Sequence, residues 1–295
     1  MGYNIPIIQI VLHMLKISRL IVLPLLLLIN GCASLMSSVT SGIADDLANT
    51  ILNSSDVETV KEGIPAYLLM IDSFLRSSPD NSNLLLAASN LNGAFSVFTD
   101  GERSELLTQK SLDYAMRAAC LEIKMLCGFQ NLNFESYQLV VDKLDVKDVP
   151  LAFSLGVAWA GWLQAHSGDW NAIAQLAKVK YLMAKVLELN PSHDNGGPHL
   201  YMGGLETILP ASMGGRPEKG RQHFERAIEL SNGEFLLAKV VFAEQYAKLT
   251  FNKTLHDQLL NEVIAADPVV EGMTLTNTLA QQRAKVLLDD SDEYF

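Results

Sequence analysis

The chain has 295 residues, with 22 basic and 33 acidic side chains and a formal net charge of −11 at pH 7. A surface this acidic argues against nucleic acid as a partner, because phosphate binding needs clustered lysine and arginine. Only two cysteines accompany Cys32, which excludes a disulfide framework.

The N-terminal segment has the layout of a secretory signal. Lys16 and Arg19 precede an apolar run that ends on a small residue before Cys32. The sequence Ile29-Asn30-Gly31-Cys32 resembles the lipobox of bacterial lipoproteins, in which the cysteine is lipidated and becomes the new N-terminus, although Asn30 is unusual two positions before the cysteine. We therefore predict a signal peptide over 1–31 and a lipidated linker over 32–56.

The start of the signal peptide is open to two interpretations. A chain that begins at Met14 has ordinary signal-peptide proportions, so residues 1–13 are interpreted as a start-site artefact. The alternative is a retained transmembrane anchor, but the apolar stretch after Arg19 is about 11 residues, shorter than the ~20 that a spanning helix needs. Ala33 follows Cys32 where aspartate blocks outer-membrane sorting in many Gram-negative lipoproteins, so by analogy we expect an outer-membrane protein facing the periplasm.

The rest of the chain has the composition and periodicity of helices. Alanine and leucine are frequent, apolar residues recur at intervals of three and four, and strand-type alternation is scarce. We predict an all-α domain over 57–295. Its helices are expected near 58–77, 82–99, 103–127, 133–144, 148–166, 169–189, 198–209, 216–231, 233–249, 252–266 and 271–288.

Cys120 and Cys127 both fall inside the expected helix 103–127. A rise of about 1.5 Å per residue places them about 10 Å apart, beyond the ~7 Å that a disulfide spans. The sequence therefore predicts two separate buried thiols on one helix face.

Helix stops recur at fairly regular intervals. They fall at Pro79, Pro191, Asn232 and Pro268, a spacing near 37 residues, and helix–turn–helix units with a period near 34 are typical of tetratricopeptide repeats. The unit over 216–232 carries the clearest pattern, with Phe224 and Ala227 three apart, whereas the other units are degenerate. A plain helical bundle fits the same stops. The fold class is therefore predicted as all-α helical hairpins of tetratricopeptide type, in a solenoid or closed bundle.

Motifs for catalysis, metals and nucleotides are missing. The segment from His193 to His199 holds metal-ligand residue types but lacks zinc-site spacing, and it is interpreted as a turn after Pro191. The paired glycines at 196–197, 203–204 and 214–215 do not form a nucleotide fingerprint. We expect no catalytic residue, no metal and no cofactor.

Two tryptophans three residues apart mark a candidate cleft. Trp159 and Trp162 share one face of a helix flanked by small residues, and they either pack between repeats or form a wall of a ligand cleft. Other polar residues lie on helices that otherwise look buried, and they either line the same cleft or are satisfied core groups: His199, Tyr201, Asn277 and Arg283.

The C-terminal half carries a family resemblance. It rests on Gly196-Gly197-Pro198-His199-Leu200-Tyr201, Gly214-Gly215-Arg216-Pro217-Glu218-Lys219, His223-Phe224-Glu225-Arg226-Ala227-Ile228 and Leu275-Thr276-Asn277-Thr278-Leu279-Ala280. With Trp159, these segments resemble the T component of TRAP transporters, a tetratricopeptide-repeat lipoprotein family of bacterial periplasms, over about residues 60–290.

The resemblance implies a function that is not enzymatic. It implies a homotrimer that associates with the extracytoplasmic solute receptor of a tripartite ATP-independent transporter and hands on a hydrophobic or organic-acid ligand. The alternative is a structural scaffold lipoprotein for an envelope assembly, with no small ligand. A hydrolase on a helical scaffold is a third interpretation, disfavoured by the missing motifs.

Overall fold

The computed structural model describes residues 49–295, and the predictions made for residues 1–48, including the signal peptide over 1–31 and the lipidation of Cys32, lie outside this range. The chain divides into two compact units, Met1–Leu52 and Asn53–Phe295. Only the helical residues 49–52 of the first unit are described, and the account below concerns the second. None of the described helices combines the length and the apolar composition of a membrane-spanning segment.

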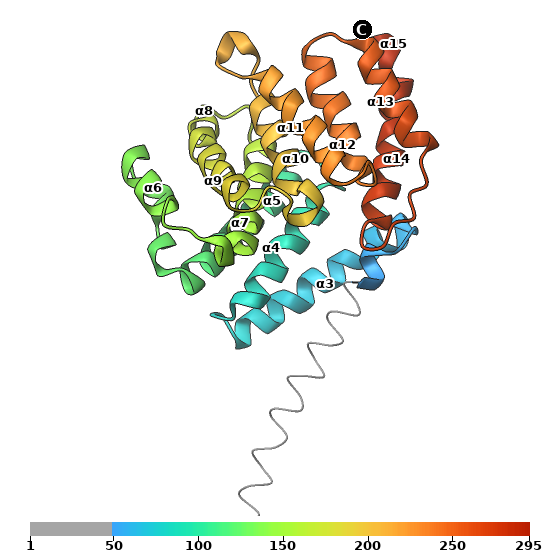
Figure 1. The fold of residues 1–295 in the computed structure, drawn as a ribbon. Coiled ribbons are helices and arrows are strands. Elements are labelled where there is room, and N and C mark those ends of the chain that lie inside the picture. Colours follow the sequence, from blue (N-terminus) through green and yellow to red (C-terminus); the bar gives the residue numbers. More distant parts are fainter. Residues whose placement is uncertain (1–48) are drawn as a thin grey trace, which may run out of the picture. The chain divides into compact units, whose positions relative to one another are not determined.

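The second unit is built from helices, and no strand occurs among the described residues, which confirms the predicted all-α class. Most of the larger helices pack against a close neighbour in sequence, as expected for helical hairpins in either a repeat or a bundle (Figure 1). The helices are α3 (Val57–Ser77), α4 (Ser82–Ser96), α5 (Gly101–Glu122), α6 (Phe134–Val141), α7 (Val149–Ala165), α8 (Trp170–Ile173), α9 (Leu176–Leu189), α10 (His193–Thr207), α11 (Pro217–Leu230), α12 (Leu236–Val241), α13 (Lys253–Ala265), α14 (Thr274–Asp289) and α15 (Ser291–Tyr294). A π-helical segment, η5 (Phe242–Ala247), continues α12.

Side-chain caps fix the starts of several helices. Asp56 accepts a hydrogen bond from the backbone N–H of Thr59 at the start of α3, and Asn81 does the same for Leu84 at the start of α4. Such caps satisfy N–H groups that have no partner inside a helix. The polar residues between apolar runs therefore place these helix boundaries within one or two residues of the predicted positions.

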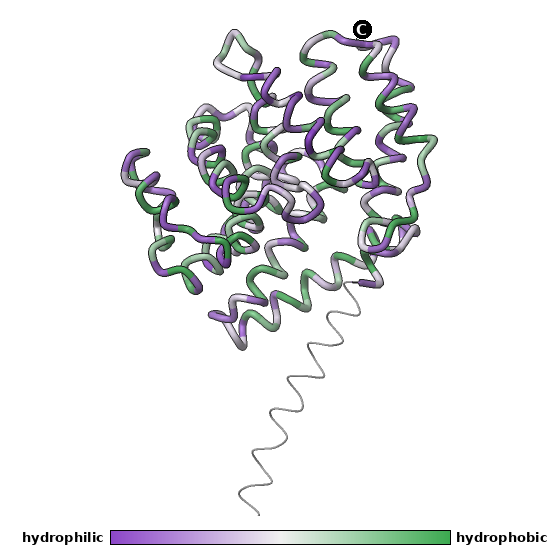
Figure 2. The backbone as a smooth tube through the Cα atoms, in the orientation of Figure 1, coloured by the Kyte–Doolittle hydropathy of each residue, from purple (hydrophilic) through white to green (hydrophobic). Residues whose placement is uncertain are grey.

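Among residues 49–295, three hydrophobic clusters share helices, so the core is continuous along the second unit. The first joins α3, α4 and α5, and the second runs from α5 to α10. The third runs from α10 to α14, so α5 and α10 each contribute to two clusters. Polar and apolar residues mix along the helices in Figure 2, because one stripe of each helix faces this core.

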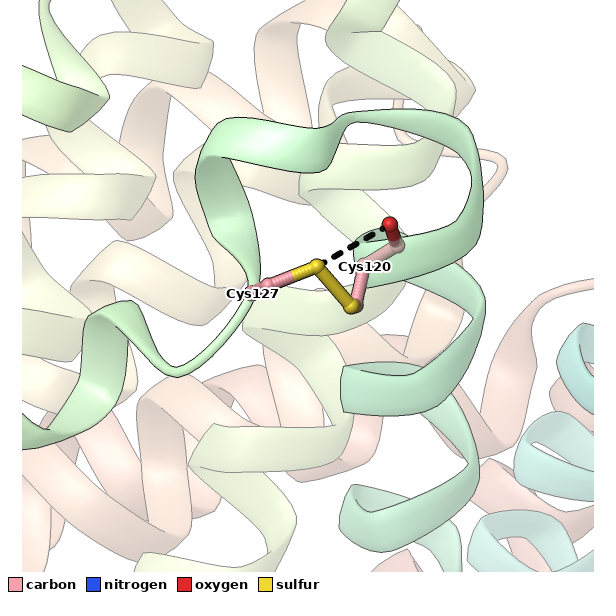
Figure 3. Close-up of a disulfide and its surroundings, with 2 residues drawn as sticks. All are labelled: Cys120 and Cys127. Carbon is pink, nitrogen blue, oxygen red and sulfur yellow. Dashed lines mark hydrogen bonds between the residues drawn. A yellow bond between two sulfur atoms is a disulfide. The ribbon is translucent and has the colours of Figure 1, made fainter.

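The predicted helix 103–127 and the predicted separate thiols are both wrong. Helix α5 ends at Glu122, and the chain turns back through the short 3₁₀ segment η1 (Lys124–Leu126). The turn brings the Cα atoms of Cys120 and Cys127 to 4.4 Å, and the two cysteines form a disulfide (Figure 3). The 10 Å estimate assumed a continuous helix, and the broken helix removes that assumption.

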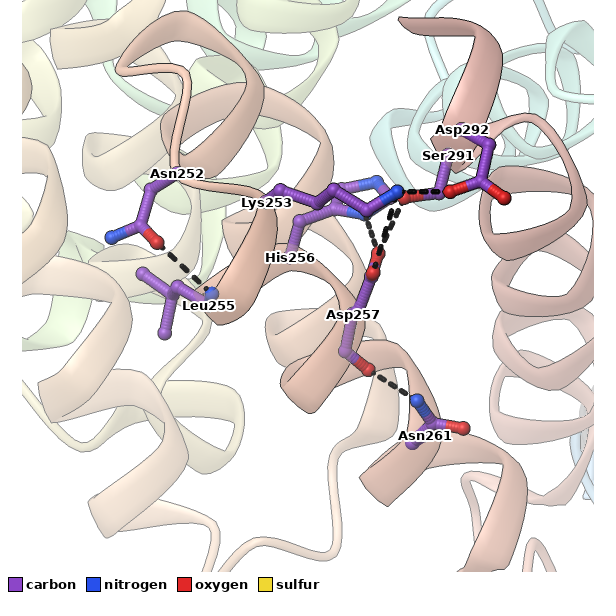
Figure 4. Close-up of polar contacts among 8 residues, drawn as sticks. All are labelled: Asn252, Lys253, Leu255, His256, Asp257, Asn261, Ser291 and Asp292. Carbon is purple, nitrogen blue, oxygen red and sulfur yellow. Dashed lines mark hydrogen bonds and ion pairs between the residues drawn. The ribbon is translucent and has the colours of Figure 1, made fainter. Parts of the chain in front are cut away.

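The last helices are tied to α13 by polar contacts (Figure 4). Ser291 donates a hydrogen bond to Asp257 at 2.6 Å, and Lys253 forms an ion pair with Asp292. The buried ring of His256 meets the ring of Phe295 edge to face, with centroids 5.1 Å apart. These contacts hold α15 against α13 at the end of the stack.

Candidate functional site

Trp159 lies in a filled aromatic core. Only 2% of the residue is exposed, and its ring meets the edges of Phe129 at 5.9 Å and Tyr137 at 6.3 Å between ring centroids. One turn earlier, Gly156 lies so close to α9 that an added Cβ would meet the Cε of Met183 at 2.8 Å. The small residues of α7 therefore let neighbouring helices close around Trp159.

Trp162 is half-buried at the surface between α7 and α5. Its indole N–H donates to the side-chain oxygen of Gln109 at 2.7 Å, and its ring stacks on His166 at 4.8 Å. Gln109 in turn donates to Asp113. The two tryptophans thus differ in environment. Trp159 is enclosed by aromatic rings, whereas Trp162 is hydrogen-bonded to polar side chains that reach the surface.

The Gly-Gly-Pro segment shapes the start of α10. Asp194, Asn195 and Gly196 have φ angles of 47°, 54° and 85°, so the backbone reverses before Pro198. An added Cβ at Gly196 would meet the Cβ of Leu230 at 3.0 Å, and one at Gly197 would meet the ring of Phe153 at 2.8 Å. This reversal brings the first turn of α10 onto both α7 and α11.

His199 on α10 contacts His223 on α11. Their Nδ1 atoms are 2.9 Å apart, so one ring donates and the other accepts. Burial, with the nearby His223 and Arg226, lowers the pKa of His199 to about 4. Burial also lowers the pKa of His223. Both rings are consequently neutral at pH 7.

One helical turn beyond Gly203, Glu206 is a buried carboxylate between two cations. It pairs with Lys180 on α9 and Arg216 before α11, and only 3% of its side chain is exposed. Burial acts to raise the pKa of Glu206, but hydrogen bonds from Arg216 and Lys180 outweigh it and leave the pKa below its ordinary value. The sequence prediction missed this ion-pair network. The signal that could have revealed it is that Glu206 is the only charged residue in the otherwise apolar segment 203–209.

The remaining candidates are Tyr201 on α10 and two residues of α14. The ring of Tyr201 meets Phe153 at 5.8 Å. Asn277 is fully buried on α14, where it accepts from the N–H of Leu236 at 3.0 Å and donates to the carbonyl of Glu234 at 2.9 Å. Arg283, also on α14, pairs with Glu244 in η5.

The six predicted residues therefore divide between two parts of the unit. Trp159 belongs to the second cluster, and Trp162 and Tyr201 pack against it, with His199 on the same helix as Tyr201. Asn277 and Arg283 instead join α14 to α12 and η5. Packing accounts for the position of Trp159. Assignment of the six residues to one ligand or partner cleft stays a prediction.

A cavity of about 330 Å³ lies elsewhere, at the end of α5. Met116, Arg117 and Cys120 line it together with Leu121, Gly128, Gln130 and Asp80, and none of the six predicted residues takes part. The side-chain oxygen of Gln130 is buried and accepts no hydrogen bond. Across residues 49–295, no group of three or more His, Cys, Asp or Glu side chains is placed to hold a metal ion.

The consecutive helical hairpins share a continuous core and are joined by buried hydrogen bonds and ion pairs. This architecture is that of an all-α helical repeat or bundle protein. The chain belongs to the TRAP transporter T-component family (TAtT), whose sequence profile matches residues 53–295. This confirms the resemblance seen in the sequence and gives the chain a transport-related, non-enzymatic role at a membrane-associated or periplasmic location. No curated protein matches the chain significantly.

Proposed function

We propose that the chain is a periplasmic adaptor, anchored to the outer membrane through a lipid at Cys32. In this function it forms a trimer, associates with the solute-binding receptor of a TRAP transporter, and binds or passes on a hydrophobic or organic-acid ligand. The match to the T-component family across the whole second unit, residues 53–295, is the observation that carries the proposal. The lipobox-like sequence ending at Cys32 supports the anchor.

The first test is the mass of the unlipidated chain that begins at Ala33. Light scattering after gel filtration would be measured alone and after mixing with the solute receptor of the same transporter. The proposal expects a trimer whose elution shifts when the receptor is added. A monomer that is unaffected by the receptor would contradict it.

A scaffold lipoprotein without a small ligand is the second candidate. It is favoured by the filled core around Trp159, because a side chain enclosed by Phe129 and Tyr137 leaves no room for a ligand at that point. Trp162 can distinguish the two functions, because its half-buried ring, hydrogen-bonded to Gln109 near the surface, is accessible to a ligand whereas the ring of Trp159 is not. Quenching of tryptophan fluorescence by candidate ligands, compared between the native chain and Trp162→Phe, distinguishes ligand binding from a purely structural role.

A further inference from the structure

Helix α3 has apolar side chains on the face that points away from the core. Its inner face buries Val60, Ile64, Leu68, Ile71 and Leu75. On the opposite face, Leu69 is 74% exposed, Phe74 50% and Met70 43%. A surface helix normally carries polar residues there, and the end of a helical stack needs a polar outer face for solubility.

The exposed residues form a continuous stripe. Ala66, Met70 and Phe74 follow one another at intervals of four, and Pro65 and Leu69 form the adjacent row. We call these five residues the outer stripe of α3. Single exposed apolar residues are common on proteins, but a contiguous group marks a surface that meets an apolar partner.

Charge is arranged around the outer stripe and not on it. No charged residue occurs between Glu62 and Asp72, and Asp72 accepts a hydrogen bond from Tyr114 on α5 at 2.8 Å. Lys61, which forms an ion pair with Glu58, lies near one end of the stripe together with Glu62, and Arg76 lies near the other end. Long basic side chains at the ends of an apolar face let it lie in a membrane interface, since their charged heads reach the headgroups.

The loop between α13 and α14 lies beside the N-terminal end of α3, separate from the outer stripe. Its Gly272 N–H donates to the side chain of Asn53 at 2.8 Å, four residues before α3 begins, and Figure 1 shows the loop beside that end of α3. Val269 in this loop is 67% exposed. An apolar side chain is thus also exposed beside the N-terminal end of α3.

The short chain segment before α3 indicates which surface the outer stripe contacts. Only 24 residues lie between Cys32 and Val57, and the fully extended chain spans at most about 80 Å from one to the other. A tether of this length holds α3 at a high effective concentration at the surface that carries the anchor. We propose that the outer stripe of α3 lies on the lipid bilayer, so that the chain rests on the membrane along this helix. This inference depends on the proposed anchor at Cys32 and is independent of the receptor and ligand.

A single-cysteine label tests the contact directly. Cys120 and Cys127 are paired and Cys32 is acylated in the proposed mature form, so Met70→Cys supplies one free thiol for an environment-sensitive fluorophore. The lipidated chain would be reconstituted into vesicles of phosphatidylethanolamine and phosphatidylglycerol. The fluorophore is expected to shift to the blue and to be quenched by spin-labelled lipids. A label at Leu139→Cys, which is 63% exposed on α6, is expected to show neither effect.

Other outcomes overturn the inference. A label at position 70 with the same emission in vesicles and in protein released by cutting the linker would contradict bilayer contact. Shielding that persists in the released protein and grows with its concentration would assign the stripe to a second copy. Shielding that appears only with the solute receptor would assign the stripe to that receptor.

Variants of the outer stripe give a second readout. The chain beginning at Ala33 would be tethered to vesicles through an N-terminal His tag and nickel-chelating lipid, which makes the label test independent of lipidation.

The same chain without a tether tests the contribution of the stripe to vesicle partitioning. A triple variant is expected to lower this partitioning by about tenfold or more: Leu69→Gln, Met70→Gln and Phe74→Gln. Leu139→Gln with Val146→Gln is the matched control, and an equal effect of both sets would contradict the inference. Mass spectrometry of the N-terminal peptide tests the anchor itself, so failure of the anchor and failure of the contact are distinguishable.

Discussion

At the scale of single residues, Glu206 is the carboxylate whose replacement has the clearest consequence. Glu206→Gln leaves Lys180, which is 16% exposed, without its countercharge. Loss of one partner of a buried ion pair destabilises a protein by about 3 kcal/mol. Urea unfolding measures this, and Glu229→Gln, which breaks an exposed pair with Arg226, is expected to cost less than about 0.5 kcal/mol. Equal costs would show that the buried network is not coupled to stability.

The histidine pair predicts a dependence of stability on pH. The pKa of His199 in the folded chain is about 4, below the value near 6.5 of an unfolded histidine, and the pKa of His223 is lowered too. The folded state therefore binds fewer protons, and its stability falls as the pH drops from about 6.5 towards 4.

The urea midpoint of the native chain and of His199→Gln, measured from pH 7.5 to 4.5, checks this. Since both rings are partly exposed, the loss attributable to the pair is expected to be about 1 kcal/mol, and the variant is expected to lose less than the native chain. His193→Gln, on the same helix, is the control. Identical pH profiles for the native chain and His199→Gln would contradict the assignment.

At the scale of elements, the α10–α11 contact depends on a glycine. An added Cβ at Gly203 would meet three ring atoms of Phe224 at 2.6, 2.7 and 2.9 Å. Because an aromatic ring in a close-packed core cannot yield, Gly203→Ala is expected to destabilise the chain by about 2 kcal/mol. Gly161→Ala on α7 has nothing within 4 Å and is expected to be neutral or slightly stabilising through helix propensity. Thermal unfolding of both variants makes the comparison.

The disulfide stabilises the turn that ends α5. It closes a short loop, so the double variant Cys120→Ser/Cys127→Ser is expected to lose about 2 kcal/mol. A reductant is expected to lower the stability of the native chain by a similar amount and to leave the double variant unchanged. Equal responses of the two proteins to reductant would contradict this role.

Asn277 joins two elements through groups that have no access to solvent. Asn277→Ala removes the acceptor of the Leu236 N–H and the donor to the Glu234 carbonyl, and unsatisfied buried groups cost about 2 kcal/mol. The variant distinguishes a structural role from a ligand-binding role. Loss of a structural residue lowers the free energy of unfolding, whereas loss of a ligand-binding residue lowers the affinity for the ligand and leaves the free energy of unfolding unchanged. Urea unfolding of Asn277→Ala against Gln258→Ala, an exposed helical amide, is the measurement.

At the scale of the whole molecule, the shared helices predict cooperative unfolding. Trp159 lies in the second cluster and Trp162 packs against it, whereas Trp170 is 70% exposed, so a change in buried tryptophan fluorescence reports the second cluster. Circular dichroism reports every helix. Because α5 and α10 each contribute to two clusters, the two signals are expected to change at the same urea concentration. Separate transitions would show that the clusters unfold independently.

Periodicity and helix stops sufficed to predict the fold class and most helix boundaries. They were insufficient at Cys120 and Cys127, because no local signal in the segment 120–127 marks the end of α5 and the pairing depends on the turn that follows. The candidate site was harder to predict, since polar residues on buried helices look alike in a sequence. Asn277 accepts a hydrogen bond from the Leu236 N–H at the start of α12, and His199 contacts His223. Only tertiary packing reveals these partners.

Helix α10 has a consequence for how the two halves of the unit influence each other. Met202 and Leu205 pack in the cluster that holds Trp159, whereas Leu200 packs in the cluster that holds Phe224. Close-packed clusters on both sides leave this helix no independent freedom. A partner or ligand that displaced α10 on one side would therefore have to repack the other, so α10 is the mechanical link between the N-terminal and C-terminal halves.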